Sequence, residues 1–351
     1  VLTLLSAVAV AACGGSSAGD STAGSTEAVE GTEAVAATEA EGTEASSDKR
    51  LHLAFLPGVT ANAYFQTEIK SAKETAAKEN AELTVIDSQL DEQKQVQQLE
   101  DLVATKQYDG ILLVPLNGAA VVPAVESALK SGIAVGADDV PIGPDPTSTE
   151  TQVPGVAVYS GRPFSVHGEN GAELTKRACE GIDPCNVAFM FGVKASTYDQ
   201  ALFKAFKEGI ESSPNIHVVA EAEGLYTREG GLAAMQDVLS AHDDINVLVA
   251  ADQEAAGAEG AIKAAGEADQ VKIIGFGGTK QAVEAVKAGR WFGDSVQVPI
   301  NEAELGIKGV IDAIRSGKTT GYVDPVVAAK APDNGIITKE NAAEFTPQFE
   351  G

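Results

Sequence analysis

Residues 51–87 read LHLAFLPGVTANAYFQTEIKSAKETAAKENAELTVID, and the expected fold follows from this stretch. Its first six residues, LHLAFL (51–56), form a short apolar run that Pro57 and Gly58 end, which predicts a buried strand. A helix is predicted over Tyr64–Glu79, and ELTVID (82–87) predicts a second strand. Two strands joined through a helix run parallel in a sheet. The stretch therefore predicts a parallel sheet with helices on its faces.

The same alternation continues through two series of strands and helices. The first adds a helix at Gln93–Lys106, strand 110–115, a helix that ends at Ser131, and strands 133–137 and 155–159. The second has helices at Ser165–Arg177, 197–212, 228–241, 256–265 and 279–288, between strands 186–191, 216–222, 245–250, 271–276 and 292–297. A helix at Asn301–Arg315 and a strand near Tyr322–Ala329 come last. We predict an α/β fold with two similar doubly wound parallel-sheet lobes.

Composition excludes some classes of partner. The 351 residues carry a formal net charge of −26, which repels nucleic acid and anionic lipid headgroups, so neither is an expected partner. Hydrophobic residues make up 44% of the chain, enough for two buried cores. The charge itself does not identify a ligand, and a cationic ligand stays compatible with it.

The N-terminal segment has a different character. VLTLLSAVAVAA (1–12) is apolar and precedes Cys13, which resembles a bacterial lipobox and implies a truncated signal peptide (1–13) with lipidation of Cys13. The alternative is an ordinary secretory signal with a chance cysteine. Residues 14–48 are acidic and lack aromatic and basic residues, which predicts a disordered acidic tether. We expect an extracytoplasmic protein that is attached to the bacterial cell membrane through lipid alone.

Polar and aromatic side chains follow several of the predicted strands. In doubly wound sheets the residues just beyond the carboxyl ends of the strands bind ligands. Carboxylates and amides bind hydroxyl groups, while aromatic rings pack on C–H surfaces. These positions therefore predict a site for a small polyhydroxylated ligand, with candidates Asn62, Tyr64, Phe65, Asp138, Asp139, Gln200, Tyr226, Asp252 and Gln297.

Two segments resemble a known family. LAFLPGVTANAYFQTEIKSAKETAAKENAELTVIDSQ (53–89) and IIGFGGTKQAVEAVKAGRWFGDSVQVP (273–299) resemble ribose/galactose-type periplasmic binding proteins, which have the type I solute-binding fold. The resemblance implies two lobes joined by a three-segment hinge that closes on the ligand. It implies an N-terminal lobe of residues 49–158 plus 298–326 and a C-terminal lobe of residues 159–297 plus 327–351.

The resemblance also assigns roles by position. Asn62, Tyr64 and Phe65 match a first-lobe loop that contacts ligand, and Asp139, or else Asp138, matches an aspartate that binds sugar hydroxyls. Tyr226 matches an aromatic wall, and Gln297 matches a glutamine at a hinge crossing. The alternatives are that Tyr64 and Phe65 begin a core-facing helix, that the two aspartates form a turn, and that Tyr226 is a surface tyrosine.

The sequence departs from the family pattern at several of these positions. Val140 and Gln200 stand at or near positions where arginine is common, Ala251 replaces a common asparagine ahead of Asp252, and Gly277 replaces an aspartate. These changes remove charge-assisted hydrogen bonds to an ordinary pentose or hexose. They favour a different sugar, a polyol or a sugar-derived signal molecule.

Cys179 and Cys185 flank a short turn between a helix and a strand. In an exported protein they predict a disulfide, and the alternative is a pair of free thiols. A C-x5-C pair without a neighbouring histidine is a poor zinc site, and His167 has no adjacent ligand set, so no metal is expected. Trp291 is predicted to be a core residue at the start of a strand.

Three hypotheses about function follow. The first is binding without catalysis, by an extracytoplasmic ABC-transporter subunit that is monomeric, needs no cofactor and presents a sugar or polyol to permease subunits. The second is a sensor subunit that presents its ligand to a signalling receptor. The third is a sugar-processing enzyme, which the sequence disfavours because it contains no G-x-S-x-G or H-E-x-x-H motif.

Overall fold

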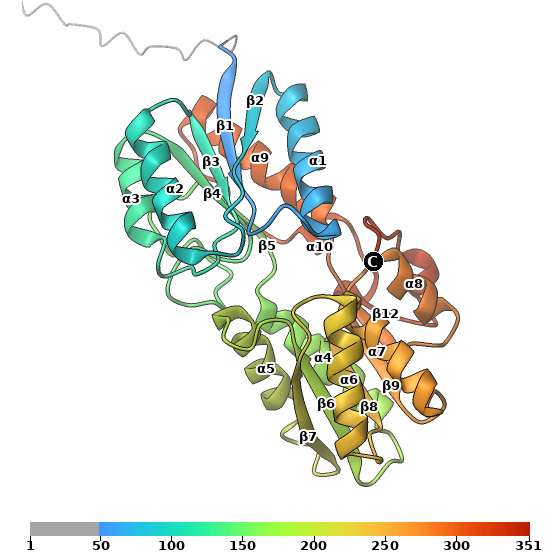
Figure 1. Cartoon of the computed structure of the whole chain (residues 1–351). Helices are drawn as coiled ribbons and strands as arrows, with labels where there is room; N and C mark the ends of the chain where they lie inside the picture. Colours follow the sequence, from blue (N-terminus) through green and yellow to red (C-terminus); the bar gives the residue numbers. More distant parts are fainter. Residues whose placement is uncertain (1–48) are drawn as a thin grey trace, which may run out of the picture. The chain divides into compact units, whose positions relative to one another are not determined.

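The structure is a computed structural model and describes residues 49–351. The predicted signal peptide, the lipidated Cys13 and the tether over 14–48 lie outside the described residues. Residues 49–351 build two six-stranded sheets with helices on both faces of each (Figure 1), so the predicted fold class is confirmed.

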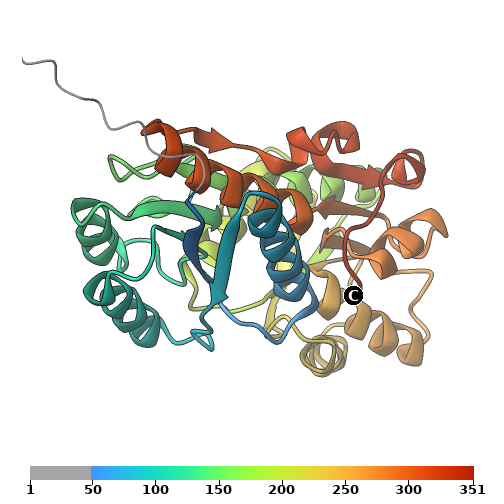
Figure 2. The same cartoon turned by 90° about the horizontal axis from the view of Figure 1, so that it is seen from above.

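The first sheet has the strand order β11-β5-β4-β3-β1-β2, and every pairing is parallel. Helices α1 and α9 cover one face, while α2 and α3 cover the other (Figure 1). Figure 2 shows α9 lying beside α1 across this sheet. The strands are β1 (Leu51–Leu56), β2 (Ala81–Val85), β3 (Gly110–Leu113), β4 (Ala134–Asp139), β5 (Val158–Gly161) and β11 (Gly321–Val323). The helices are α1 (Ala63–Lys78), α2 (Glu92–Thr105), α3 (Val122–Lys130) and α9 (Pro299–Ser316).

Strand β1 shows why its sequence is an unbroken apolar run. Leu53 and Phe55 pack toward α1 and α9, whereas Ala54 and Leu56 pack toward α2 and α3. Successive side chains of a strand point to opposite faces, so a strand covered on both faces needs apolar residues at every position. All four of these residues are at most 1% exposed.

The second sheet repeats this design with the order β12-β10-β9-β8-β6-β7, and only β12 runs antiparallel to its neighbour. Helices α4 and α5 pack on one face, and α6, α7 and α8 pack on the other. The strands are β6 (Cys185–Phe191), β7 (Ile216–Glu223), β8 (Val247–Ala251), β9 (Lys272–Gly277), β10 (Gly293–Val296) and β12 (Ile336–Thr338). The helices are α4 (Phe164–Ala178), α5 (Thr197–Ile210), α6 (Arg228–Ala241), α7 (Asp252–Ala265) and α8 (Lys280–Lys287). Trp291 is 1% exposed within this core, as predicted.

The strand predicted near Tyr322–Ala329 is wrong over most of its length. Strand β11 ends at Val323, and a short helix, α10 (Pro325–Ala328), follows. Asp324 caps α10 by accepting hydrogen bonds from the backbone N–H groups of Val326 and Val327. Proline at the first helical position suits a helix start, because its missing N–H has no partner there in any helix. Two short 3-10 turns, Pro332–Gly335 and Ala342–Glu344, flank β12.

The chain passes between the two sheets three times. It leaves the first sheet after β5, returns between β10 and α9, and leaves again between β11 and β12. Three crossings agree with the number that the family resemblance implies. The lobe limits given above stay a prediction, and the first sheet itself extends to Gly161.

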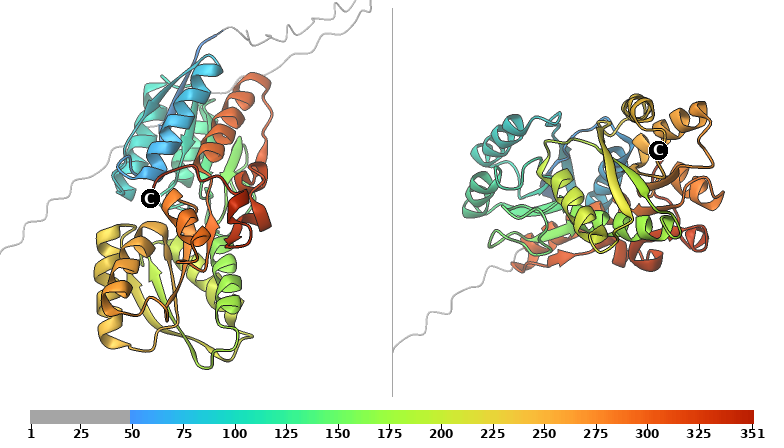
Figure 3. Two further views of the ribbon diagram at one scale, coloured as in Figure 1. Left: turned by 90° about the vertical axis from the view of Figure 1, so that its right-hand side faces the viewer. Right: turned by 90° about the horizontal axis from the view of Figure 1, so that it is seen from below.

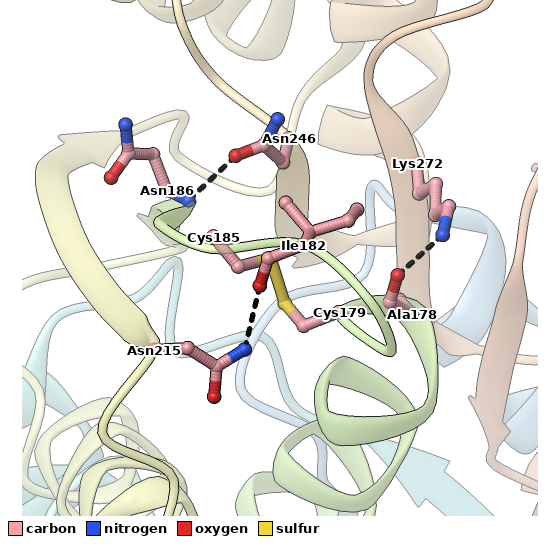
Figure 4. The surroundings of a disulfide bond; sticks show 8 residues. All are labelled: Ala178, Cys179, Ile182, Cys185, Asn186, Asn215, Asn246 and Lys272. Carbon is pink, nitrogen blue, oxygen red and sulfur yellow. Dashed lines mark hydrogen bonds between the residues drawn. A yellow bond between two sulfur atoms is a disulfide. The ribbon is translucent and has the colours of Figure 1, made fainter.

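The predicted pair of cysteines forms a disulfide between the end of α4 and the start of β6 (Figure 4). Cys179 and Cys185 are at most 1% exposed. Asn215 donates a hydrogen bond to the carbonyl oxygen of Ile182 at 2.8 Å, and the Asn186 N–H donates to the Asn246 side chain at 2.8 Å. The turn is therefore fastened to the neighbouring strands as well as by the sulfur–sulfur bond.

Candidate functional site

Strand β4 ends in the Asp138-Asp139 pair, whose side chains have different surroundings. Asp138 is fully buried, and its Oδ1 lies 3.1 Å from the position that a Cβ on Gly306 of α9 would occupy. Asp139 has a left-handed backbone with φ of 60°, and its Oδ1 lies 3.5 Å from Nε2 of Gln297. Asp138 therefore faces the helical layer, whereas Asp139 faces the crossing between β10 and α9.

A cluster of carboxyl groups, which we name the acidic cluster, surrounds this strand end and consists of Glu68, Asp138, Asp139 and Glu302. Its members come from α1, β4 and α9, and each is at most 7% exposed. The Tyr64 hydroxyl donates a hydrogen bond to Glu302. Within residues 49–351, no donor meets either carboxylate oxygen of Glu68 or of Asp138 in hydrogen-bonding geometry.

Burial dominates the ionisation of the acidic cluster. It raises the pKa of Glu302 to about 8, with the nearby Asp139 charge adding to the effect, and it raises the pKa of Asp139 to about 7. Burial followed by neighbouring carboxylates raises the pKa values of Glu68 and Asp138 well above their ordinary values. Charged forms are disfavoured when carboxyl groups are both desolvated and close together. At neutral pH the acidic cluster therefore retains protons, which lets some of its members donate hydrogen bonds.

On the second sheet, Tyr226 is held by two acidic side chains. Its hydroxyl donates to Oδ1 of Asp199 at 2.9 Å, and its backbone N–H donates to Oε1 of Glu254 at 2.9 Å. Its ring meets Phe276 edge to face at 6.4 Å. Burial, with the Asp199 charge next, raises the pKa of Tyr226 well above its ordinary value. The tyrosine is half-buried and fixed in orientation, so its ring can act as a rigid wall.

Asp252 follows a strand end, as the sequence predicted, but its side chain is buried within the second lobe. Helix α7 begins at Asp252 directly after β8, four residues before the predicted start at residue 256. Asp252 is 1% exposed, and its Oδ2 accepts a hydrogen bond from the backbone N–H of Thr279 at 2.7 Å. Asp294 of β10 is its buried neighbour, and burial followed by the Asp252 charge raises the pKa of Asp294 well above its ordinary value. Burial raises the pKa of Asp252 as well, so both carboxyl groups of this buried pair are harder to ionise than exposed ones.

This pair explains the departure at Gly277. A Cβ on Gly277 would lie 2.7 Å from Oδ2 of Asp252, and the residue has φ of 148°. An aspartate at position 277 has neither the space nor the backbone conformation that it needs. Asp294, on the neighbouring strand, supplies a carboxyl group close by; because it is fully buried, it belongs to the lobe interior rather than to its surface.

The remaining predicted residues have local structural roles. Asn62 caps α1 by accepting from the Phe65 N–H at 2.8 Å, and it thereby fixes the turn that carries Tyr64 and Phe65. Those two rings meet edge to face at 5.2 Å. Gln200 is exposed on α5 and donates to the Lys194 carbonyl oxygen at 2.7 Å, so its amide is engaged within the second lobe.

The structure thus brings Tyr64, Asp139 and Gln297 together, and it holds Tyr226 on the opposite sheet. Asp139 is close enough to Tyr226 to contribute to its raised pKa. Sequence reasoning missed Glu68, Glu302, Asp199, Glu254 and Asp294. The spacing of Tyr64 and Glu68, four residues apart on one helix face, was a signal for the first of these. The others lie on elements that meet only in the folded chain.

Two doubly wound lobes with three crossings, and with polar side chains at the strand ends beside a crossing, define a bilobed solute-binding protein. Residues 53–319 match the family described as periplasmic binding protein domain, and the chain belongs to this family. Its location is therefore extracytoplasmic. Among residues 49–351 no helix is both long and apolar enough to span a bilayer.

Known relatives and solved structures agree with this family. The D-ribose/D-allose-binding protein of Pseudomonas aeruginosa is 28% identical over 302 residues, which cover 82% of this chain and 91% of the relative. The ribose import binding protein of Salmonella typhimurium is 30% identical over 271 residues, covering 76% of this chain and 85% of the relative. A periplasmic solute-binding protein from Actinobacillus succinogenes with bound D-allose matches with a TM-score of 0.71 and 25% identity, covering 84% of this chain and 100% of that chain. The Caulobacter myo-inositol-binding protein shows the same fold, with a TM-score of 0.72 and 21% identity over 85% of this chain and 97% of that chain.

Proposed function

We propose that this protein is the substrate-binding subunit of an ABC importer and that it binds a sugar or a polyol between its two lobes. The main support for this proposal is the similarity to relatives that are named as ribose- and allose-binding proteins. The placement of Asp139 at the end of β4, beside Gln297 of a crossing segment, supports it from the structure. The protein acts by binding and closure, without chemistry, and delivers its ligand to permease subunits.

The proposed site residues differ in how directly they contact the ligand. Asp139 accepts hydrogen bonds from ligand hydroxyls, Gln297 adds a contact from the crossing, and Tyr64 and Tyr226 supply aromatic surfaces from the two lobes. Asn62 and Phe65 shape the first-lobe loop, and Gln200 lies at the exposed rim. Asp138 and Asp252 act indirectly, because their side chains are buried beneath the strand ends.

The ligand test is a thermal-shift and calorimetric titration of the full chain with D-ribose, D-allose, myo-inositol and glycerol. We expect at least one of them to raise the melting temperature. Asp139→Asn should weaken binding of that compound about tenfold or more, because an amide NH2 donor replaces one of the two oxygens that can accept from ligand hydroxyls. The exposed Asp101→Asn on α2 is the matched control. Absence of binding by all sugars and polyols tried would contradict the proposal.

The anchoring part of the proposal concerns Cys13 and residues 14–48. A lipid on Cys13 holds the protein at the membrane surface, and the acidic segment spaces the lobes away from it. Cys13→Ala should move the protein from the membrane fraction to the soluble fraction of cells. If the variant stays with the membrane, the lipid anchor is wrong.

A further inference from the structure

The last residues of the chain touch both lobes. Beyond β12, Ala342 and Phe345 join the core of the second lobe, and Phe345 is 5% exposed. The chain then leaves this core, and its dark red end lies beside α1 of the first lobe (left view of Figure 3). We name residues 348–350 (Gln348, Phe349 and Glu350) the C-terminal clip.

On the second lobe, the clip is held at the start of α8. The carbonyl oxygen of Phe349 accepts a hydrogen bond from the Lys280 N–H at 2.9 Å. The Lys280 ammonium also pairs with Glu350 at 3.2 Å, but both side chains are more than half exposed. Since exposed ion pairs contribute little, the backbone hydrogen bond is the firmer attachment.

On the first lobe, the clip caps the N-terminus of α9. Helix α9 has no side-chain cap of its own at Val298. Oε1 of Gln348 accepts from the Ile300 N–H at 2.8 Å, and Nε2 of Gln348 donates to Oδ1 of Asn301 at 2.5 Å. The first N–H groups of a helix have no partner within the helix, so Gln348 satisfies a donor that the first lobe leaves open.

Phe349 reaches the candidate ligand site. Its ring is 7% exposed and meets the ring of Tyr64 edge to face, with 5.6 Å between centroids. Tyr64 is also fixed at its hydroxyl by Glu302. A residue fastened to the second lobe therefore packs against a proposed ligand contact of the first.

The opposite flank of the site is bridged as well. The hydroxyl of Tyr198 on α5 approaches the carbonyl oxygen of Pro141 at 3.4 Å, and Tyr198 belongs to the same buried cluster as Val114 and Val140 of the first lobe. The lobes therefore touch on both sides of the site. The clip stabilises this arrangement relative to any in which the lobes separate, because its contacts to one lobe are lost when they part.

We propose that the C-terminal clip ties the lobes together and, through Phe349 and Tyr64, sets how long a ligand is retained. Phe349 is a positioning residue that acts through Tyr64, and Gln348 is the fastening to the first lobe. The effect on ligand retention rests on the proposed sugar or polyol function, whereas the effect on lobe separation does not. Loss of the clip acts mainly on ligand dissociation, since dissociation requires the lobes to part.

The first experiment uses the full chain without ligand. Small-angle X-ray scattering of wild type, Phe349→Ala and Gln348→Ala should show a larger radius of gyration in both variants. Glu350→Gln is the matched control, because it removes only the exposed pair, and it should scatter like the wild type. Gln348 is polar and only half-buried, so its variant remains informative if Phe349→Ala fails to fold.

The second experiment measures rates by stopped flow with whichever of D-ribose, D-allose and myo-inositol binds. Phe349→Ala should dissociate about two- to tenfold faster, the range that an edge-to-face aromatic pair contributes. The association rate should stay within about twofold. A merely structural residue would lower the melting temperature and leave both the radius of gyration and the dissociation rate unchanged, and that result would overturn the proposal. If no sugar binds but the clip variants have a larger radius of gyration, the proposed role of the clip in joining the lobes is supported and the proposed sugar-binding function is contradicted.

Discussion

At the scale of single residues, the acidic cluster is a feature that costs stability. Glu68 is fully buried, and burial followed by the charges of Asp138 and Glu302 raises its pKa well above the ordinary 4.5. A carboxyl group with a raised folded-state pKa keeps its proton in the folded protein while the unfolded chain loses it. The free energy of unfolding therefore falls as pH rises above about 4.5 and continues to fall until the folded-state pKa is reached, which for Glu302 is about 8.

The first prediction is that Glu68→Gln flattens this pH dependence. A neutral amide needs no proton, so the variant should unfold at higher urea concentration than the wild type at pH 8, with a gain of about 1–2 kcal/mol, and behave like it near pH 4.5. Urea unfolding across this pH range checks it. Glu74→Gln, on the exposed side of the same helix, removes only an exposed pair with Lys70 and should not give the gain in stability at pH 8. A variant that is less stable than wild type at pH 8 would show that Glu68 is ionised and satisfied.

Part of the acidic cluster was predictable from the sequence. The Asp138-Asp139 pair was visible because it follows a buried strand, where parallel sheets place ligand contacts. Glu68 and Glu302 were not predicted, since their distance from β4 depends on how α1 and α9 pack together. The buried pair of Asp252 and Asp294 was not predicted either, because the two residues come together only through the register of β8, β9 and β10.

At the scale of elements, the sequence was most informative where strands are buried on both faces. Unbroken apolar runs located β1, β3, β6, β8 and β9 to within a few residues. It failed at β12, a three-residue antiparallel edge strand, and at α10, where Asp324 and Pro325 start a helix inside an apolar stretch. Such short elements contain too few residues for a periodic spacing of apolar residues to be recognised.

A helix end gives the second prediction. Helix α2 ends at Thr105 and is followed by the capping residue Lys106, which is exposed and has a left-handed φ of 52°. A left-handed backbone strains any residue with a Cβ, so Lys106→Gly should stabilise the protein by about 0.5–1 kcal/mol in urea unfolding. Ser131→Gly, at the end of α3 where φ is −84°, lacks this strain and should give no gain. Equal effects of the two substitutions would refute the argument.

The disulfide gives the third prediction. Cys179 and Cys185 are six residues apart, and such a short loop loses little entropy on closure. The double substitution Cys179→Ala with Cys185→Ala should therefore lower the free energy of unfolding by about 2 kcal/mol. Reductant should lower the free energy of unfolding of the wild type by a similar amount and leave that of the variant unchanged. If the variant does not fold, the disulfide has a larger role than loop closure provides.

At the scale of the whole molecule, the coupling between the two lobes depends on contacts between the segments that cross from one to the other. Arg162 lies just after β5, at the first crossing, and is 2% exposed. Its guanidinium contacts the Asp324 carboxylate at 2.7 Å and donates to the Asn334 carbonyl oxygen at 2.7 Å. Asp324 and Asn334 both belong to the third crossing. One buried cation therefore fastens two of the three crossings to each other.

This arrangement leads to the fourth prediction, for Arg162→Met. The substitution keeps an apolar stem but leaves Asp324 without its counter-charge, which should destabilise the protein by about 2–3 kcal/mol. Because the crossings would no longer be fastened together, differential scanning calorimetry should resolve two transitions where the wild type shows one, as the lobes uncouple. Arg177→Met removes an exposed arginine that approaches Asp333 at 3.8 Å, and it should change stability by less than about 0.5 kcal/mol. A single transition at the wild-type temperature in Arg162→Met would mean that the lobes are coupled elsewhere, with Tyr198 and the C-terminal clip as the contacts to test next.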